Sequence, residues 1–130
     1  MTLKYVKLMS AMVLGLMMSG KIEIVHAQQY FQQPAADVSG TWTIYANNIE
    51  KPGSSLKTVT LSQNGNILTG KFKGPHQSGK LQGWVNGNHV EFSTDTHEVL
   101  TFRGQYQGGQ MSGLYGINGR HAPWRAERTQ

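Results

Sequence analysis

An alternation of apolar and polar residues with a period of two runs through most of the chain, and turn-forming residues repeatedly interrupt it. In the first such segment, Trp42, Ile44 and Ala46 alternate with Thr41, Thr43 and Tyr45. A period of two places successive side chains on opposite faces of a β-strand, so each segment predicts a strand with one buried face. No segment after residue 27 shows a helical period. The pattern therefore predicts an all-β domain.

Eight such segments follow one another in residues 39–130. Asn-Gly or Gly-Gly dipeptides mark several connections, and Asn64-Gly65 predicts a type I′ hairpin turn. Pro123 is expected at the start of the last strand, because proline cannot donate a ladder hydrogen bond. Consecutive strands joined by tight turns form an antiparallel meander, and eight strands close into a small barrel. We therefore predict an eight-stranded antiparallel up-and-down β-barrel.

The predicted inward phase of these strands is rich in aromatic residues. It comprises Trp42, Leu68, Phe72, Val85, Val90, Phe92, Leu100, Phe102, Tyr106, Met111, Tyr115 and Trp124. A barrel of this size is filled by its own side chains or keeps room for one small ligand. Five aromatic residues of this phase are candidate ligand-binding residues: Phe72, Phe92, Phe102, Tyr106 and Tyr115.

Glycine recurs on the same phase in the pattern apolar-x-Gly-x-apolar, centred on Gly70, Gly83, Gly104 and Gly113. Glycine inside a strand marks a sharp bend or a place where a large neighbour needs room. The alternative is that these glycines leave interior volume for a ligand. We favour the structural explanation, because every small barrel needs curvature.

The first 27 residues have the three-part organisation of a secretory signal peptide. Lys4 and Lys7 precede an apolar stretch over residues 8–18, and residues 25–27 form a small-x-small cleavage site. The apolar stretch is shorter than the roughly 20 residues that span a membrane. We predict cleavage after residue 27 and an exported protein, periplasmic or extracellular, that does not span the membrane after cleavage. The alternative is an uncleaved membrane anchor.

Residues 28–38 are polar, contain Pro34 and lack periodicity, which predicts a flexible N-terminal lead-in. The chain has 12 Lys plus Arg against 7 Asp plus Glu, and the predicted signal peptide holds three of the basic residues and one acid. The small remaining excess of positive charge does not indicate a nucleic-acid partner. The absence of cysteine excludes disulfides, thiolate metal sites and cysteine nucleophiles.

Residues with catalytic or metal-binding chemistry are few. Asp95, His97 and Glu98 could supply one face of a metal site, and His76 and His121 fall in other predicted turns. Their spacing matches no ligand signature, so we expect neither a metal nor a cofactor. The inward phase carries no acid–base pair, which favours a protein that is not an enzyme.

Lysines 71 and 73, with Lys57 and Lys80 on neighbouring strands, form a mild basic patch. Such a patch is typical of a solubilising outer face. The alternative is a surface that binds an anionic partner, such as a lipid headgroup or a polysaccharide.

Gly40-Thr41-Trp42 in the first strand, the strand order, and Trp124 to Arg128 in the last strand resemble the calycin superfamily, which includes lipocalin-like and avidin-like barrels. The resemblance implies that an arginine of the last strand packs over the tryptophan of the first at the closed end of the barrel. Trp42 matches that tryptophan, and Arg125 or Arg128 matches the arginine. A cation over an aromatic face contributes about 0.5–2 kcal/mol.

The leading hypothesis is an exported β-barrel binding module that holds a small apolar or aromatic molecule in its open end. The alternative is a periplasmic interaction protein such as a protease inhibitor, which could insert residues 28–38 into a protease. A barrel enzyme such as a cyclase or isomerase is the third hypothesis.

Overall fold

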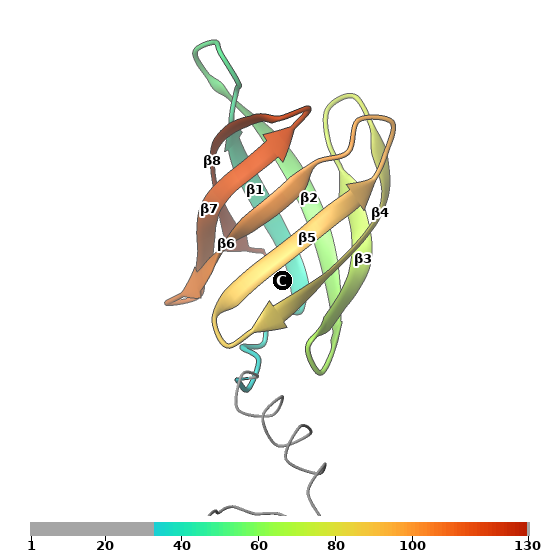
Figure 1. The fold of residues 1–130 in the computed structure, drawn as a ribbon, viewed down its shortest axis with the longest axis vertical. Coiled ribbons are helices and arrows are strands. Elements are labelled where there is room, and N and C mark those ends of the chain that lie inside the picture. Colours follow the sequence, from blue (N-terminus) through green and yellow to red (C-terminus); the bar gives the residue numbers. More distant parts are fainter. Residues whose placement is uncertain (1–32, 130) are drawn as a thin grey trace, which may run out of the picture. The chain divides into compact units, whose positions relative to one another are not determined.

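Eight strands follow one another in residues 33–129, the part of the chain that this computed structural model describes (Figure 1). They are β1 (Gly40–Asn47), β2 (Ser54–Asn64), β3 (Ile67–Lys73), β4 (Ser78–Asn86), β5 (His89–Asp95), β6 (Thr101–Gln107), β7 (Gln110–Ile117) and β8 (Arg120–Arg128). Each strand is antiparallel to the next, and β1 pairs with β8, so the sheet closes on itself. The predicted eight-stranded up-and-down barrel is confirmed. The predicted signal peptide lies outside the described residues.

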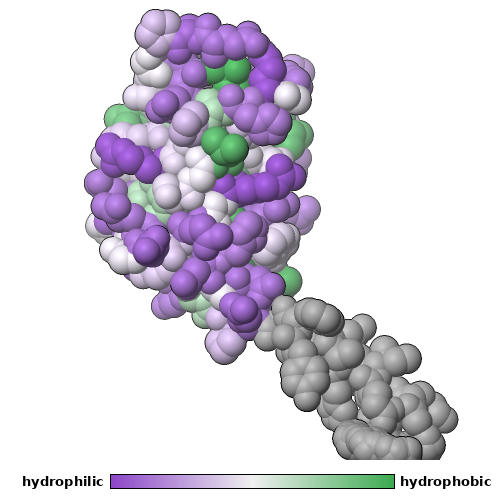
Figure 2. All heavy atoms as spheres, turned by 60° about the vertical axis from the view of Figure 1, so that its left-hand side comes forward, coloured by the Kyte–Doolittle hydropathy of each residue, from purple (hydrophilic) through white to green (hydrophobic). Residues whose placement is uncertain are grey.

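Alternation along the strands sorts side chains between a packed interior and the outer face. Of the twelve residues of the predicted inward phase, eleven are buried, and Tyr106 is partly buried against the core. Trp84 and Leu114, on the opposite phase, are 39% and 54% exposed. Figure 2 shows one face of the barrel as mostly hydrophilic, with small separate groups of hydrophobic atoms. Residues 33–129 contain no helix long and apolar enough to cross a membrane.

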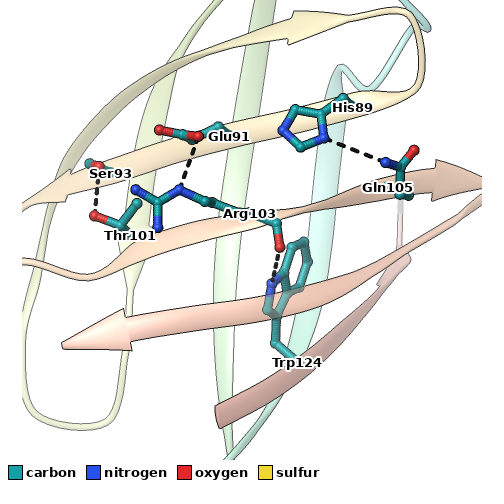
Figure 3. A network of polar contacts seen from close by, with 7 residues as sticks. All are labelled: His89, Glu91, Ser93, Thr101, Arg103, Gln105 and Trp124. Atoms are coloured by element: carbon teal, nitrogen blue, oxygen red, sulfur yellow. Dashed lines mark hydrogen bonds and ion pairs between the residues drawn. The ribbon is translucent and has the colours of Figure 1, made fainter. Parts of the chain in front are cut away.

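Two of the recurring glycines allow close approach of their neighbours: the backbone packs closely on both, and the indole of Trp124 packs on Gly104. Gly104 in β6 pairs with Gly113 in β7, which pairs in turn with Trp124 in β8. A Cβ atom at Gly104 would collide with the carbonyl oxygen of Ser112 and lie 3.1 Å from Cζ2 of Trp124. Across these glycines the Trp124 Nε1 donates a hydrogen bond of 3.1 Å to the carbonyl of Arg103 (Figure 3). Neighbouring backbone and the indole fill this space. The recurring glycines at these positions therefore serve close packing and leave no interior volume for a ligand.

The outer face of the same region is held by side-chain pairs between β5 and β6 (Figure 3). The Arg103 Nε donates to Glu91 Oε1 at 3.1 Å, and the hydroxyls of Ser93 and Thr101 lie 3.0 Å apart. These residues face away from the barrel interior. An exposed ion pair of this kind contributes about 0.2–1 kcal/mol.

Two local expectations are wrong. The hairpin after β2 turns on Gly65 and Asn66, and the positive φ lies at Gly65 alone, as a type II′ turn requires. A type I′ turn needs two positive φ values, which occur instead at Gly108 and Gly109 and at Asn118 and Gly119. Pro123 lies four residues into β8, not at its start. It is tolerated there because β8 pairs with β1 only from Trp124 onwards, so no ladder hydrogen bond to β1 is lost.

The residues just before β1 lie at one end of the barrel, which we call the closed end. The amide of Ala36 donates to the carbonyl of Gly87 at 2.8 Å, and the amide of Val38 donates to Gln63 Oε1 at 2.8 Å. Gln63 Nε2 returns a hydrogen bond to the carbonyl of Ala36 at 2.8 Å, and Val38 is fully buried. The C-terminal part of the segment expected to be a flexible lead-in is therefore anchored to the barrel.

Candidate functional site

The opposite end of the barrel, which we call the open end, carries a cavity. Four connections meet there: residues 48–53, 74–77, 96–100 and 118–119. The cavity has a volume of about 520 Å³ and is lined by Asn48, Ile49, Lys51, Ser55, Lys57, Phe72, Gly74, Pro75, His76, Gln77, His97, Glu98, Leu100, Tyr115 and Ile117. This volume lies within the roughly 300–1,000 Å³ of small-molecule sites.

Aromatic rings form the floor of this cavity. Phe72 and Tyr115 line it, and both pack on Phe102 beneath, which is fully buried. The Tyr115 and Phe102 rings are stacked with centroids 5.5 Å apart, and Phe92 stacks on Phe102 at 5.0 Å. Stacked and edge-to-face aromatic pairs each add about 0.5–1.5 kcal/mol beyond area burial. Two rings of the floor therefore face the cavity, and further aromatic rings pack beneath them.

Lys57 projects into the barrel beneath the open end. It shares the inward phase of β2 with Val59 and Leu61 and is only 8% exposed. The placement of Lys57 in an outer basic patch is therefore wrong. The remaining members of that patch, Lys71, Lys73 and Lys80, are exposed on the outer face, where Lys71 pairs with Lys80 across β3 and β4.

The ammonium of Lys57 has few partners. Its Nζ donates to Ser55 Oγ at 2.5 Å and lies 6.0 Å from the centroid of the Tyr115 ring. Within residues 33–129 it forms no ion pair with a carboxylate. Burial lowers the pKa of Lys57 below its ordinary value of 10.5, because desolvation disfavours the charged form. The cavity thus contains a cation that has no counter-ion among residues 33–129.

The phenol of Tyr115 is held by a hydrogen bond to the backbone. Its hydroxyl donates a hydrogen bond of 2.5 Å to the carbonyl of Asn47, at the end of β1. Burial raises the pKa of Tyr115 above 10.0, because desolvation disfavours the phenolate. This hydrogen bond orients the ring in the cavity floor.

The rim of the cavity is tied together across two connections. Gln77 Nε2 donates to the carbonyl of Glu98 at 2.8 Å, and the Glu98 amide donates to Gln77 Oε1 at 3.1 Å. His76 and His97 lie on the same rim, so the turns that carry them do meet at one end of the barrel. Residues 33–129 nevertheless contain no group of three or more His, Asp or Glu side chains placed to hold a metal ion.

The closed end is completed by residues of its own chain. The guanidinium of Arg128 lies 4.5 Å from the centroid of the Trp42 ring, and its Nη2 donates to the carbonyl of Asp37 at 2.8 Å. The Trp42 Nε1 donates to the carbonyl of Val38 at 2.9 Å. Arg125 lies instead over Tyr45, with 4.1 Å between the guanidinium and the ring centroid. Of the two arginines, Arg128 is the one that packs on Trp42.

A hydrogen-bonded turn precedes β1 at this end. The Asp37 carboxylate accepts hydrogen bonds from the hydroxyl of Ser39 at 2.6 Å and from its amide at 3.0 Å. The hydroxyl hydrogen bond, followed by that of the amide, lowers the pKa of the Asp37 carboxyl. The turn presents the carbonyl of Asp37 to Arg128.

The candidate ligand-binding residues do not all meet. Phe72 and Tyr115 line the cavity, whereas Phe92 and Phe102 lie beneath it as packing support. Tyr106 lies at the closed end, edge-on to Trp42 with centroids 6.3 Å apart. Lys57 and Ser55 also belong to the cavity and were not among the candidate binding residues, although their alternation with Leu56 and Thr58 places both on the inward phase of β2.

No protein-family model matches the chain, and a search of curated proteins finds no significant match.

Proposed function

We propose that this chain is an exported, calycin-like β-barrel binding module that holds a small molecule with an apolar or aromatic body in its open end. The observation that carries the proposal is the cavity of about 520 Å³ above a floor of aromatic rings. Sites for small molecules are concave and mostly apolar, with a few placed polar groups. Export rests on the signal-peptide pattern of residues 1–27.

The asymmetry of the barrel supports the same function. One end is covered by the chain before β1, and the other is left open between connections. The Arg128 guanidinium over the Trp42 indole also agrees with the calycin resemblance. The interior between the ends is filled by side chains, so a ligand would occupy the open end only.

Native mass spectrometry of the mature chain, gently purified from its own host, tests the proposal. We expect a small-molecule adduct. Ile49→Trp places an indole in the cavity and should abolish the adduct, because Ile49 lines the cavity wall. Leu56→Trp is the matched control, since Leu56 is 60% exposed on the outer face and its replacement should leave the adduct unchanged.

Two other outcomes would overturn the proposal. An adduct with another protein would favour the interaction-protein alternative, in which a segment before the barrel enters a protease. The part of that segment from Ala36 to Val38 is hydrogen bonded to the barrel and would have to detach first. A bare mass in every preparation would show that the cavity has no resident ligand.

A further inference from the structure

The environment of Lys57 lacks what a buried cation requires. Burying a charge is costly unless it is paired and hydrogen bonded. An ammonium has three N–H donors, and here one is taken up by Ser55 Oγ. The Tyr115 ring centroid, at 6.0 Å, lies at the outer limit of a cation–π contact. A partner with acceptor atoms and negative charge would complete this environment.

We propose that the open-end cavity binds an organic anion, an apolar or aromatic body carrying a carboxylate, and that the Lys57 ammonium is the group that recognises the carboxylate. The inference rests on the proposed function and deepens it, because it names the chemical class of the ligand. Charge-assisted hydrogen bonds to a carboxylate are about twice as strong as neutral ones.

Ser55 is placed to share the carboxylate with Lys57. Its hydroxyl accepts from Lys57 Nζ, which leaves the hydroxyl hydrogen able to donate to a ligand oxygen. Tyr115 does not compete for the anion, because its hydroxyl already donates to the carbonyl of Asn47. The recognition group therefore consists of two residues of β2 that share one phase.

The other charged and titratable side chains around the cavity do not neutralise Lys57. Lys51 has the same sign, and His76 and His97 supply no negative charge. Among residues 33–129, Glu98 is the only carboxylate in the cavity wall. Its backbone is tied to Gln77, and it forms no ion pair with Lys57.

Three probes with one aromatic body test the charge preference: 2-naphthoate, naphthalene-2-methanol and naphthalene-2-methylammonium. Their dissociation constants are measured by calorimetry at pH 7 with the wild-type chain. A hydrogen-bonded charge contributes about 1.5–3 kcal/mol, so 2-naphthoate should bind at least about tenfold more tightly than the alcohol. The ammonium probe should bind most weakly, because it would face a like charge.

Variants assign the preference to Lys57. In Lys57→Met the dissociation constants of 2-naphthoate and of the alcohol should become equal. Lys57→Arg should still bind 2-naphthoate more tightly than the alcohol. Lys71→Met is the matched control, since it removes the same charge from the outer face and should leave the preference intact. Retained binding of the alcohol shows that the cavity of Lys57→Met is folded.

The outcomes separate the two proposals. Equal binding of the anion and the alcohol by the wild type, or a preference that survives in Lys57→Met, would overturn the role of Lys57 and leave the binding module standing. Binding of none of the three probes would overturn the proposed function, and the inference would fall with it.

Discussion

Each end of the barrel holds a cation beside an aromatic ring, but the two ends complete its surroundings differently. At the closed end, Arg128 has the Trp42 indole, the Tyr106 ring at 5.8 Å and the carbonyl of Asp37. At the open end, Lys57 has one hydroxyl and one distant ring. Residues 33–129 complete the first environment and leave the second incomplete. Local conflicts of this kind are expected at functional sites, where they reduce stability.

The largest expected effect is at the closed end. Trp42→Ala should lower the free energy of unfolding by about 3–5 kcal/mol, because it removes a fully buried indole and leaves a cavity beneath Arg128. Urea denaturation followed by far-ultraviolet circular dichroism measures the change. An unchanged midpoint would show that Trp42 does not hold the closed end together.

The two arginines of β8 provide the next comparison. Arg128→Met should lower the free energy of unfolding by about 1–2 kcal/mol, because it removes a cation–π contact with a buried ring and a hydrogen bond to Asp37. Arg125→Met should cost less than about 1 kcal/mol, because Arg125 and its partner Glu127 are exposed. Equal losses would show that Arg128 contributes no more than a surface residue.

At the open end we expect a substitution to stabilise the barrel. Lys57→Met should raise the free energy of unfolding at pH 7 by about 1 kcal/mol, because replacing buried charge by an apolar side chain is often stabilising. For a domain of this size that corresponds to a rise of about 4–8 °C in the melting temperature. A lower melting temperature for Lys57→Met would show that the ammonium is stabilised where it lies.

The smallest expected effect is on the pH dependence of stability. The pKa of Lys57 is lower in the folded chain than its ordinary value of 10.5, so the unfolded chain binds more protons between the two values. The free energy of unfolding of the wild type should therefore rise with pH between these two pKa values. Below both values, the destabilisation caused by the buried Lys57 ammonium is fully present. The difference between wild type and Lys57→Met should shrink as pH approaches 10.5.

Tyr115 also titrates in the alkaline range, and its effect is opposite. Its pKa is raised by folding, so its contribution to stability is lost as pH rises through the folded value. Both chains contain Tyr115, so the difference between their unfolding free energies isolates Lys57. A difference that does not vary with pH would contradict the lowered pKa.

The barrel was predictable from the sequence because strand alternation is a local property. The same phase rule also distinguishes Arg128 from Arg125, since Arg128 alone continues the inward phase of Trp124 and Ala126. It places Lys57 inside as well, against the general rule that lysine is almost never fully buried.

Other features depend on contacts between distant segments. The anchoring of Ala36 and Val38 uses backbone groups and the side chain of Gln63, about 25 positions along the chain, and no local pattern marks it. The cavity arises where three connections meet, residues 48–53, 74–77 and 96–100, and the identity of their residues does not reveal this. The candidate aromatic residues could therefore be predicted from the sequence, but which of them line the same cavity could not.

The pairing of β1 with β8 determines when this chain can finish folding. Thr129 donates its amide to the carbonyl of Thr41, 88 positions earlier, beside the ladder that closes the barrel. Until β8 has paired with it, β1 presents an unpaired edge on which other chains can assemble. Contacts between such distant positions slow folding, so the chain would need chaperone protection most in the interval before β8 pairs with β1.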